Sequence, residues 1–154
     1  NARTQRKSRH PEVSYRSLPE VEQTAWAVDA SCPGNPGPME YRGVDLASGE
    51  EIFRVGPFPD GTNNIGEFLA IVHGMALMEK QGVMHTIYSD SRTAMAWVRN
   101  RRVKTLLQPT EKNRKVFELM RRALLWLNTH SFRTKIVKWD TPHWGEIPAD
   151  FGRK

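Results

Sequence analysis

The segment TAWAVDASC, residues 24–32, decides how this chain folds. Its apolar residues lead up to Asp29, and the turn-forming run PGNPGP at 33–38 follows almost at once. A short apolar run that ends at proline and glycine is typical of a buried β-strand. We therefore predict a first strand over 24–32 that carries a carboxylate near its end.

Two more strands are expected directly afterwards. The segments MEYRGVDLA (39–47) and EEIFRVGPF (50–58) flank the turn SGE, which is typical of a β-hairpin. The turn formers of PDGTNN (59–64) then predict a loop.

Helices and strands alternate through the rest of the chain. In residues 65–82 the apolar side chains recur near helical spacing, and Gly82 suits a C-terminal stop. Ser91 and Thr110 are suitable N-caps for later helices. The remaining predictions are a strand over 84–90, helices over 91–102 and 110–130, a strand over 131–139 and a short helix from Trp144. This order predicts an α/β fold with a five-stranded mixed sheet, three antiparallel strands and then two parallel ones, flanked by helices.

The composition is that of one globular domain. With 154 residues, of which 38% are hydrophobic, the chain is large enough to bury a core. No apolar run approaches the ~20 residues of a membrane helix, and the chain does not begin with a signal-peptide pattern. The single cysteine, Cys32, excludes an internal disulfide and suits a reducing compartment. We expect a cytoplasmic monomer with no membrane partner.

The charge of the chain points to a polyanionic partner. The formal net charge is +6 and the isoelectric point is about 9.8, so the surface attracts nucleic acid. Residues 1–20 show no lasting periodicity, and they hold a basic cluster of Arg3, Arg6, Lys7 and Arg9. We predict a flexible basic arm or linker remnant over 1–20 and one folded domain over 21–154.

Several carboxylates occupy related positions in the predicted elements. Asp29 and Asp90 each close an apolar strand, and Glu67 lies near the start of the first long helix. Asp150 follows Glu146 by four residues, which predicts one shared face of a final helix. Taken singly, each acid is more often a cap, a turn residue or a surface group; their joint placement favours a site.

A bound divalent cation would offset the repulsion between these carboxylates. If the first and fourth strands are neighbours, Asp29 and Asp90 lie close together and repel each other. Ligands that are all oxygen suit Mg²⁺ or Mn²⁺, whereas the five histidines and the one cysteine show no zinc spacing.

Four motifs resemble type 1 ribonuclease H, in particular the bacterial members that end in WGE…AD. They occur in order as VDASCPGNPG, GTNNIGEFLAI, IYSDS and KWDTPHWGEIPAD, and the resemblance covers residues 23–154. It implies a ribonuclease H-like fold and an endonuclease that cuts the RNA strand of RNA/DNA hybrids with two Mg²⁺ ions, for which Mn²⁺ substitutes. The products would carry 5′-phosphate and 3′-hydroxyl ends, and residues 21–154 would be the catalytic domain.

The resemblance also implies a role for each acid. Asp29 is expected to bridge both metals, and Glu67 and Asp90 to bind the metal on the leaving-group side. Asp150 is expected on the metal that holds the attacking water, and Glu146 as an auxiliary group. Many members carry a histidine where this chain has Asp140. His143 lies nearby at a different spacing, and an exposed loop histidine explains it equally well.

The substrate contacts implied by the resemblance fall on two strands. On the RNA side, Cys32, Pro33 and Gly34 would offer backbone groups, and Arg92 replaces a glutamine of the family. Contacts in the minor groove are implied for Asn35, Asn63 and Asn64, although asparagine is also a common turn residue.

On the DNA side, Thr62, Asn64 and Thr105 match a phosphate-binding pocket, and Trp97 and Thr141 match a channel that favours deoxyribose. Trp97 at helical spacing also suits a core position. The run RNRRVK (99–104) extends the basic character toward this side, since residues 91–122 hold ten Lys or Arg.

Two other functions stay open at this point. A DNA-directed nuclease or transposase core would share the fold, but the paired asparagines and the GNPG loop argue against it. A hybrid-binding module without catalysis would gain nothing from carboxylates beside phosphate. In the last motif, Trp139, Trp144 and Pro148 are expected to fix the backbone that carries Glu146 and Asp150, with Pro148 in a first helical turn.

Overall fold

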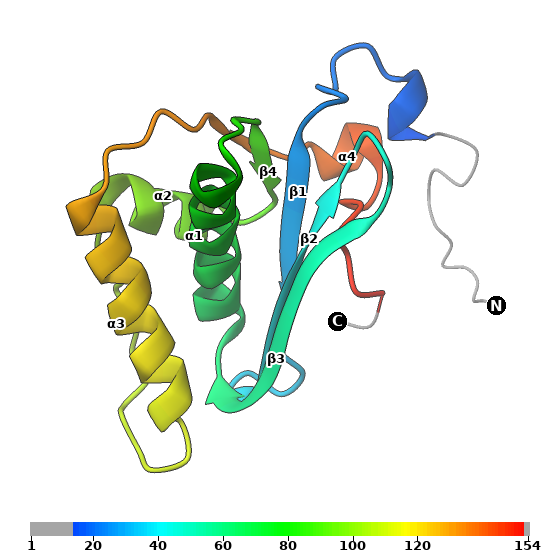
Figure 1. Cartoon of the computed structure of the whole chain (residues 1–154). Helices are drawn as coiled ribbons and strands as arrows, with labels where there is room; N and C mark the ends of the chain where they lie inside the picture. Colours follow the sequence, from blue (N-terminus) through cyan, green and yellow to red (C-terminus); the bar gives the residue numbers. More distant parts are fainter. Residues whose placement is uncertain (1–13, 153–154) are drawn as a thin grey trace, which may run out of the picture.

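The computed structural model describes residues 14–152, and its centre is a single five-stranded sheet in the order β3-β2-β1-β4-β5 (Figure 1). β1 pairs antiparallel with β2, as β2 does with β3, whereas the β1–β4 and β4–β5 pairs are parallel. The predicted mixed sheet, three antiparallel strands followed by two parallel ones, is therefore confirmed. The strands are β1 Trp26–Ser31, β2 Gly37–Asp45, β3 Glu51–Gly61, β4 Ile87–Ser89 and β5 Ile136–Lys138.

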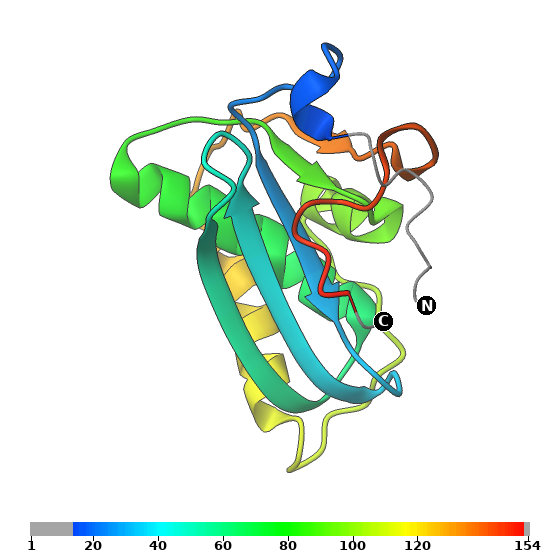
Figure 2. The same ribbon diagram turned by 90° about the vertical axis from the view of Figure 1, so that its right-hand side faces the viewer.

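Helical segments cover both faces of this sheet (Figures 1 and 2). The long helices α1, α2 and α3 lie on one face; η1, α4 and the C-terminal segment lie on the other. None of the helices in the described residues is both long and apolar enough to cross a membrane. The helices are η1 Tyr15–Ser17, α1 Asn63–Gln81, α2 Arg92–Asn100, α3 Arg114–Thr129 and α4 Thr141–Trp144.

β1 is buried on both faces because it lies at the centre of the sheet. Val28 and Ala30 pack toward the long helices, whereas Ala27 packs toward the C-terminal segment. The alternation follows from the two-residue period of a strand. A continuous apolar run, such as the one that precedes Asp29, is the pattern expected of such a doubly covered strand.

The start of α1 differs from the expected loop over 59–64. β3 continues to Gly61, which pairs with Gly37 of β2, and the helix begins two residues later. Thr62 is the N-cap, and its hydroxyl accepts a hydrogen bond from the backbone N–H of Ile65. At the other end Gly82 adopts φ +70°, which confirms the predicted C-terminal stop.

Of the two predicted N-caps for the later helices, one is confirmed and one is not. Ser91 caps α2 through the N–H of Ala94, as predicted. α3 begins only at Arg114, because Asn113 occupies the cap position and exchanges hydrogen bonds with Thr110. The final strand is also shorter than the predicted 131–139.

The predicted helix from Trp144 is wrong. α4 ends there, and Gly145 follows with φ +83°. Glu146 and Asp150 therefore lie in a non-helical segment and do not share a helix face. Proline stands in the first turn of α4 as Pro142, not as Pro148.

Burial explains the course of this last segment. Ile147 and Ala149 are 1% and 0% exposed and pack into the second hydrophobic cluster, around the fully buried Trp139. Trp144 packs edge-on against Trp139 at 4.9 Å, and the Trp139 indole N–H donates to the carbonyl of Gly145 at 2.8 Å. The expected packing role of both tryptophans is thus confirmed.

The predicted arm over 1–20 lies largely outside the described residues, which begin at residue 14. Within residues 14–20, Tyr15 and Leu18 pack against the second hydrophobic cluster. The Tyr15 hydroxyl also donates to the carbonyl of Leu46 at 2.7 Å. This part of the predicted arm packs onto the sheet.

Candidate active site

Three carboxylates meet beside the central strands. Asp29, Glu67 and Asp90 each offer a ligand oxygen, and these atoms lie within 4.8 Å of one another. The strand register accounts for the two aspartates: Trp26 pairs with Ile87 and Ala27 with Tyr88, and the same offset brings Asp29 level with Asp90. The expectation that these two acids come close together is confirmed.

Glu67 reaches the group because α1 lies very close to β1. A Cβ atom at Gly66 would lie 2.8 Å from the Cβ of Ala30 and 3.2 Å from the Cγ of Met39. Only a residue without a side chain allows this approach. Gly66 therefore places the next residue, Glu67, against the end of β1.

The burial of this group sets its chemistry. Asp29 and Glu67 are 0% and 1% exposed, and Asp90 is half-buried. Carboxylates that are removed from water and close to one another repel strongly, and a divalent cation offsets this repulsion. The donor atoms are all oxygen, so the residues present fit Mg²⁺ or Mn²⁺.

The two C-terminal acids are placed differently from this group. Within the described residues, Asp150 and Glu146 are not members of the 4.8 Å set. Asp150 lies in the segment that crosses the sheet beside β1 (Figure 2), and its carboxylate accepts a hydrogen bond from the N–H of Gly152 at 2.9 Å. Glu146 is exposed, directly after the turn at Gly145.

Asp140 and His143 form a pair of their own. The Nδ1 atom of His143 lies 2.9 Å from Oδ2 and 3.0 Å from Oδ1 of Asp140, across one turn of α4. The carbonyl of Asp140 also accepts the N–H of Trp144 at 2.7 Å. Asp140 thus helps to organise α4, which explains an acid that sequence reasoning left without a role.

A pocket of about 590 Å³ collects most of the residues predicted for the DNA side. Basic Lys104, from the run RNRRVK, lies among them. Pro36 and Gln108 also line the pocket. The sequence did not single them out, because no local pattern distinguishes them from ordinary loop residues. The predicted residues that line this pocket are Asn35, Thr62, Asn64, Trp97 and Thr105.

Trp97 serves the pocket and the core together. It is 8% exposed and packs edge-on against Phe68 of α1 at 6.1 Å. In the same basic run Arg101 points elsewhere, because its guanidinium donates to the carbonyl of Leu127 at 2.6 Å and lies over the ring of Phe132. Lys104, not Arg101, is therefore the basic residue of that run that lines the pocket.

The loop after β1 is hydrogen-bonded to the end of β3 and the start of α1. The side-chain carbonyl of Asn35 accepts the N–H of Asn63 at 2.7 Å, and the Cys32 thiol donates to the carbonyl of Gly61. Burial raises the pKa of the Cys32 thiol, with a partly opposing effect of its hydrogen bond to the backbone of Gly37. The loop that holds Cys32, Pro33, Gly34 and Asn35 therefore has a set position beside α1.

The other predicted contacts lie at helix starts. Arg92 is the exposed first residue of α2, two residues after Asp90. Thr141 is the half-buried first residue of α4. Neither lines the pocket that contains Trp97.

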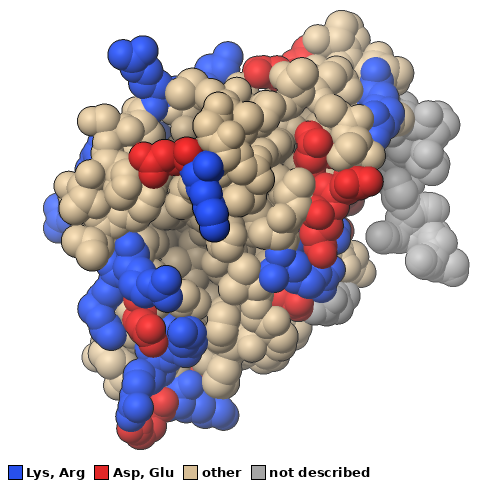
Figure 3. Space-filling view, in the orientation of Figure 1, with Lys and Arg blue, Asp and Glu red and all other residues tan. Residues whose placement is uncertain are grey.

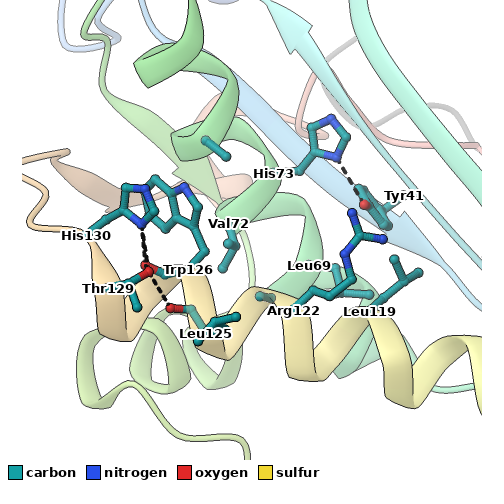
Figure 4. Close-up of a pocket in the computed structure, with 12 residues that line it drawn as sticks. Tyr41, Leu69, Val72, His73, Leu119, Arg122, Leu125, Trp126, Thr129 and His130 are labelled. Atoms are coloured by element: carbon teal, nitrogen blue, oxygen red, sulfur yellow. Dashed lines mark hydrogen bonds between the residues drawn. The ribbon is translucent and has the colours of Figure 1, made fainter.

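A second pocket, of about 390 Å³, lies between α1 and α3 (Figure 4). Tyr41, His73 and Arg122 face it, and its lining contains no carboxylate. It therefore lacks the ligand set of the first site. Figure 3 shows basic side chains gathered over α3 and the loop before it. The exposed Lys112 belongs to that loop, and the exposed Arg114 is the first residue of α3.

Comparisons with known proteins point to one family. The family model described as RNase H matches residues 21–147. A ribonuclease H of Desulforamulus reducens is 32% identical over 128 residues, which cover 72% of this chain and 79% of that protein. A ribonuclease H of Neorickettsia sennetsu is 32% identical over 83 residues, which cover 51% of this chain and 55% of that protein.

The matches differ in extent. The chain spans 55%, 57% and 44% of three bacterial ribonucleases H, about half of their length. A crystal structure of RNase H1 from the archaeon Halobacterium salinarum is 19% identical, with a TM-score of 0.48, over 77% of this chain and 86% of that one. Because the family model covers well over half of the sequence, the chain belongs to the RNase H family.

Proposed function

We propose that this chain is an endoribonuclease that hydrolyses the RNA strand of RNA/DNA hybrids and leaves 5′-phosphate and 3′-hydroxyl ends. The observation that carries the proposal is the buried group of Asp29, Glu67 and Asp90 in a member of the RNase H family. A binding module would gain nothing from this group, because carboxylates repel phosphate.

The metal ligands are Asp29, Glu67, Asp90 and Asp150, and two Mg²⁺ ions, replaceable by Mn²⁺, fit their oxygen donors. Bound divalent ions lower the pKa of water and stabilise the charge that develops on the departing 3′ oxygen. Asp29 would contribute to both ion positions, and Glu67 and Asp90 would hold the ion on the leaving-group side. Asp150 would hold the ion on the side of the attacking water, and the exposed Glu146 would assist exchange at that side.

The substrate is held from two directions. The loop 32–35 and the start of α1 face the RNA strand, where Asn35, Asn63 and Arg92 read the minor groove and the 2′-hydroxyls. The pocket that contains Thr62, Asn64, Trp97 and Thr105 takes a phosphate of the DNA strand, with Lys104 as its cation. Thr141 extends this DNA side.

The cellular compartment, the oligomeric state and the domain bounds belong to the same proposal. The single cysteine, Cys32, suits the reducing cytoplasm. We propose a monomer in which residues 21–154 are the catalytic domain and residues 1–20 a basic arm.

The test uses an RNA/DNA hybrid in which each strand carries a separate end label. Incubation with Mg²⁺ should cut the RNA strand alone, with no cutting of an all-DNA duplex. Asp90→Asn should lower the rate by at least about a hundredfold, because even residues that only orient a metal ligand cost 10–100-fold.

The matched pair Glu67→Gln and Glu79→Gln controls for the chemical change itself. Both positions lie on α1, but Glu79 is exposed and pairs with His130. Glu79→Gln should cleave at the native rate and Glu67→Gln should not. Cleavage of the DNA duplex, or hybrid binding without cleavage by the native protein, contradicts the proposal.

A further inference from the structure

Arg42 joins the sheet to the segment that carries Asp150. Its Nε donates to the carbonyl of Ala149 at 2.7 Å, and its Nη2 donates to the carbonyl of Asp150 at 2.6 Å. These are the two peptide carbonyls that flank the α-carbon of Asp150. One guanidinium therefore binds the backbone on both sides of that residue.

The strand register puts Arg42 next to Asp29. Arg42 of β2 pairs directly with Asp29 of β1, and on its other side with Arg54 of β3. Directly paired residues point to the same face of a sheet, with Cβ atoms about 5 Å apart. The side chain that binds the Asp150 backbone thus starts from the strand position directly beside Asp29.

Arg42 is itself held in place by its neighbours. Its Nη1 lies 3.2 Å from Oε1 of Glu51, which also binds Arg54 at 3.0 Å, and Glu40 binds Arg54 from the other side. Burial opposes the ionised form of Glu51, but the hydrogen bonds from Arg54 and Arg42 outweigh it and lower the pKa of Glu51. Both guanidinium groups lie over the ring of Phe151, at 5.1 and 5.0 Å.

The C-terminal segment needs such an anchor because no helix or strand sets its conformation. Burial of Ile147 and Ala149 fixes how deeply the segment lies. It does not by itself fix the orientation of the peptide groups around Asp150, and these determine where the Asp150 side chain points. A turn bond from the Asp150 N–H to the carbonyl of Ile147 at 2.8 Å sets part of that orientation. The two bonds from Arg42 hold the carbonyls on both sides of Asp150 and complete it.

We propose that Arg42 is a positioning residue that directs the Asp150 carboxylate toward the group formed by Asp29, Glu67 and Asp90. The inference rests on the proposed function only in assigning Asp150 to the metal site. Arg42 touches neither metal nor substrate in this scheme, since it acts through the backbone.

The test is the affinity for Mn²⁺, measured by isothermal titration calorimetry without any substrate. Arg42→Met keeps an unbranched apolar stem and removes the donors of the side chain. Mn²⁺ affinity should fall on the order of 10–100-fold, the usual effect of residues that orient a metal ligand. In an Asp150→Asn background the same substitution should change the affinity no further, because the two residues act as one unit.

Arg101→Met is the matched control. Arg101 also donates to a backbone carbonyl, that of Leu127, and its guanidinium lies 4.8 Å from the centroid of the Phe132 ring. Its loss should lower the melting temperature, as Arg42→Met does, and leave Mn²⁺ affinity at the native value. If Arg42→Met fails to fold, Arg42→Lys replaces it, with one carbonyl bond kept and an intermediate affinity expected.

Either of two results overturns the inference. The first is a native Mn²⁺ affinity in Arg42→Met. The second is that Arg42→Met lowers Mn²⁺ affinity as much in the Asp150→Asn background as it does in the native protein. The cleavage assay on the native protein separates this failure from that of the proposed function. A native protein whose Mn²⁺ affinity depends on Arg42 and Asp150 but that cuts no hybrid contradicts only the function. A native protein that cuts hybrids, with Mn²⁺ affinity independent of Arg42, contradicts only the positioning role.

Discussion

At the scale of single residues, side chains far from the carboxylates respond to burial in ways that can be measured. His73 of α1 lies in the pocket beside α3, stacked on Phe53 at 4.2 Å and 3.1 Å from the hydroxyl of Tyr41. Burial lowers the pKa of His73 below its ordinary 6.5. It also raises the pKa of Tyr41 to about 12, an effect that nearby Arg122 partly opposes.

The first prediction concerns acid stability. Because the pKa of His73 is lower in the folded protein, the unfolded chain binds the proton more readily below pH 6.5. The His73 contribution to stability is present above that pH and is lost as the pH falls. Urea unfolding at pH 8 and pH 5.5 should therefore show a smaller loss of stability in His73→Phe than in the native protein. Equal losses in both proteins would contradict the burial of His73.

The second prediction concerns Gly66. Alanine there would force a Cβ to within 2.8 Å of the Ala30 Cβ, so Gly66→Ala should cost about 1–3 kcal/mol in urea unfolding. Mn²⁺ affinity should fall as well, because Glu67 moves with the helix.

Gly74→Ala is the control on the same helix. Its new Cβ would meet the Cδ1 of Ile87 at 3.1 Å, the far end of a flexible side chain. The gain in helix propensity, up to about 1 kcal/mol, offsets that contact. Gly74→Ala should therefore be near neutral. A Gly66→Ala protein as stable as Gly74→Ala would show that the α1–β1 approach is not tight.

At the scale of elements, the loop before α3 depends on one buried side chain. Asn113 is 1% exposed, accepts the N–H of Thr110 at 2.7 Å and donates to the carbonyl of Gln108 at 2.9 Å. The same loop supplies Lys104 and Thr105 to the pocket proposed for the DNA strand. The cap of α3 therefore also shapes that pocket.

The third prediction follows from this double role. Asn113→Ala should destabilise the protein by about 1–3 kcal/mol, because it leaves two partly buried backbone groups without a partner. Affinity for RNA/DNA hybrid in a filter-binding assay should fall too. Asn128→Ala removes a similar bond, to the carbonyl of Leu124, from an exposed asparagine at the far end of α3. It should stay within about 0.5 kcal/mol of the native protein with unchanged binding; equal effects of both substitutions would speak against this role of Asn113.

At the scale of the whole molecule, a divalent cation held by the clustered carboxylates would raise the stability of the fold. A ligand that binds only the folded state adds about 2.7 kcal/mol at a hundred times its dissociation constant. For a domain of this size each kcal/mol raises the melting temperature by about 2–4 °C.

The fourth prediction is a rise of several degrees in melting temperature when Mn²⁺ is added to the native protein, and its loss in Asp29→Asn. Without metal, Asp29→Asn should melt above the native protein, because one of the mutually repelling charges is gone. Differential scanning calorimetry with EDTA and with excess Mn²⁺ measures both effects. A melting temperature that does not change when Mn²⁺ is added would argue against a metal site at these residues.

Much of the fold could be predicted from local patterns. The apolar run before Asp29, the Ser91 cap and the stop at Gly82 each depend on residues within a few positions of one another, so the sequence by itself determined these elements. It also placed Asp29 in the first strand and Asp90 directly after the fourth, although Asp29 lies two residues before the end of β1; the parallel pairing of β1 with β4 then brings the two acids level.

Only the tertiary structure decided the rest. The conformation of residues 145–152 depends on the burial of Ile147 and Ala149 in a cluster built from distant segments, which overrides the helical spacing of Glu146 and Asp150. The role of Arg42 depends on strand register and on a contact across 108 positions of the chain. Such contacts are set by how strands pair and how closely helices approach them, and no periodicity within a short stretch of sequence encodes that.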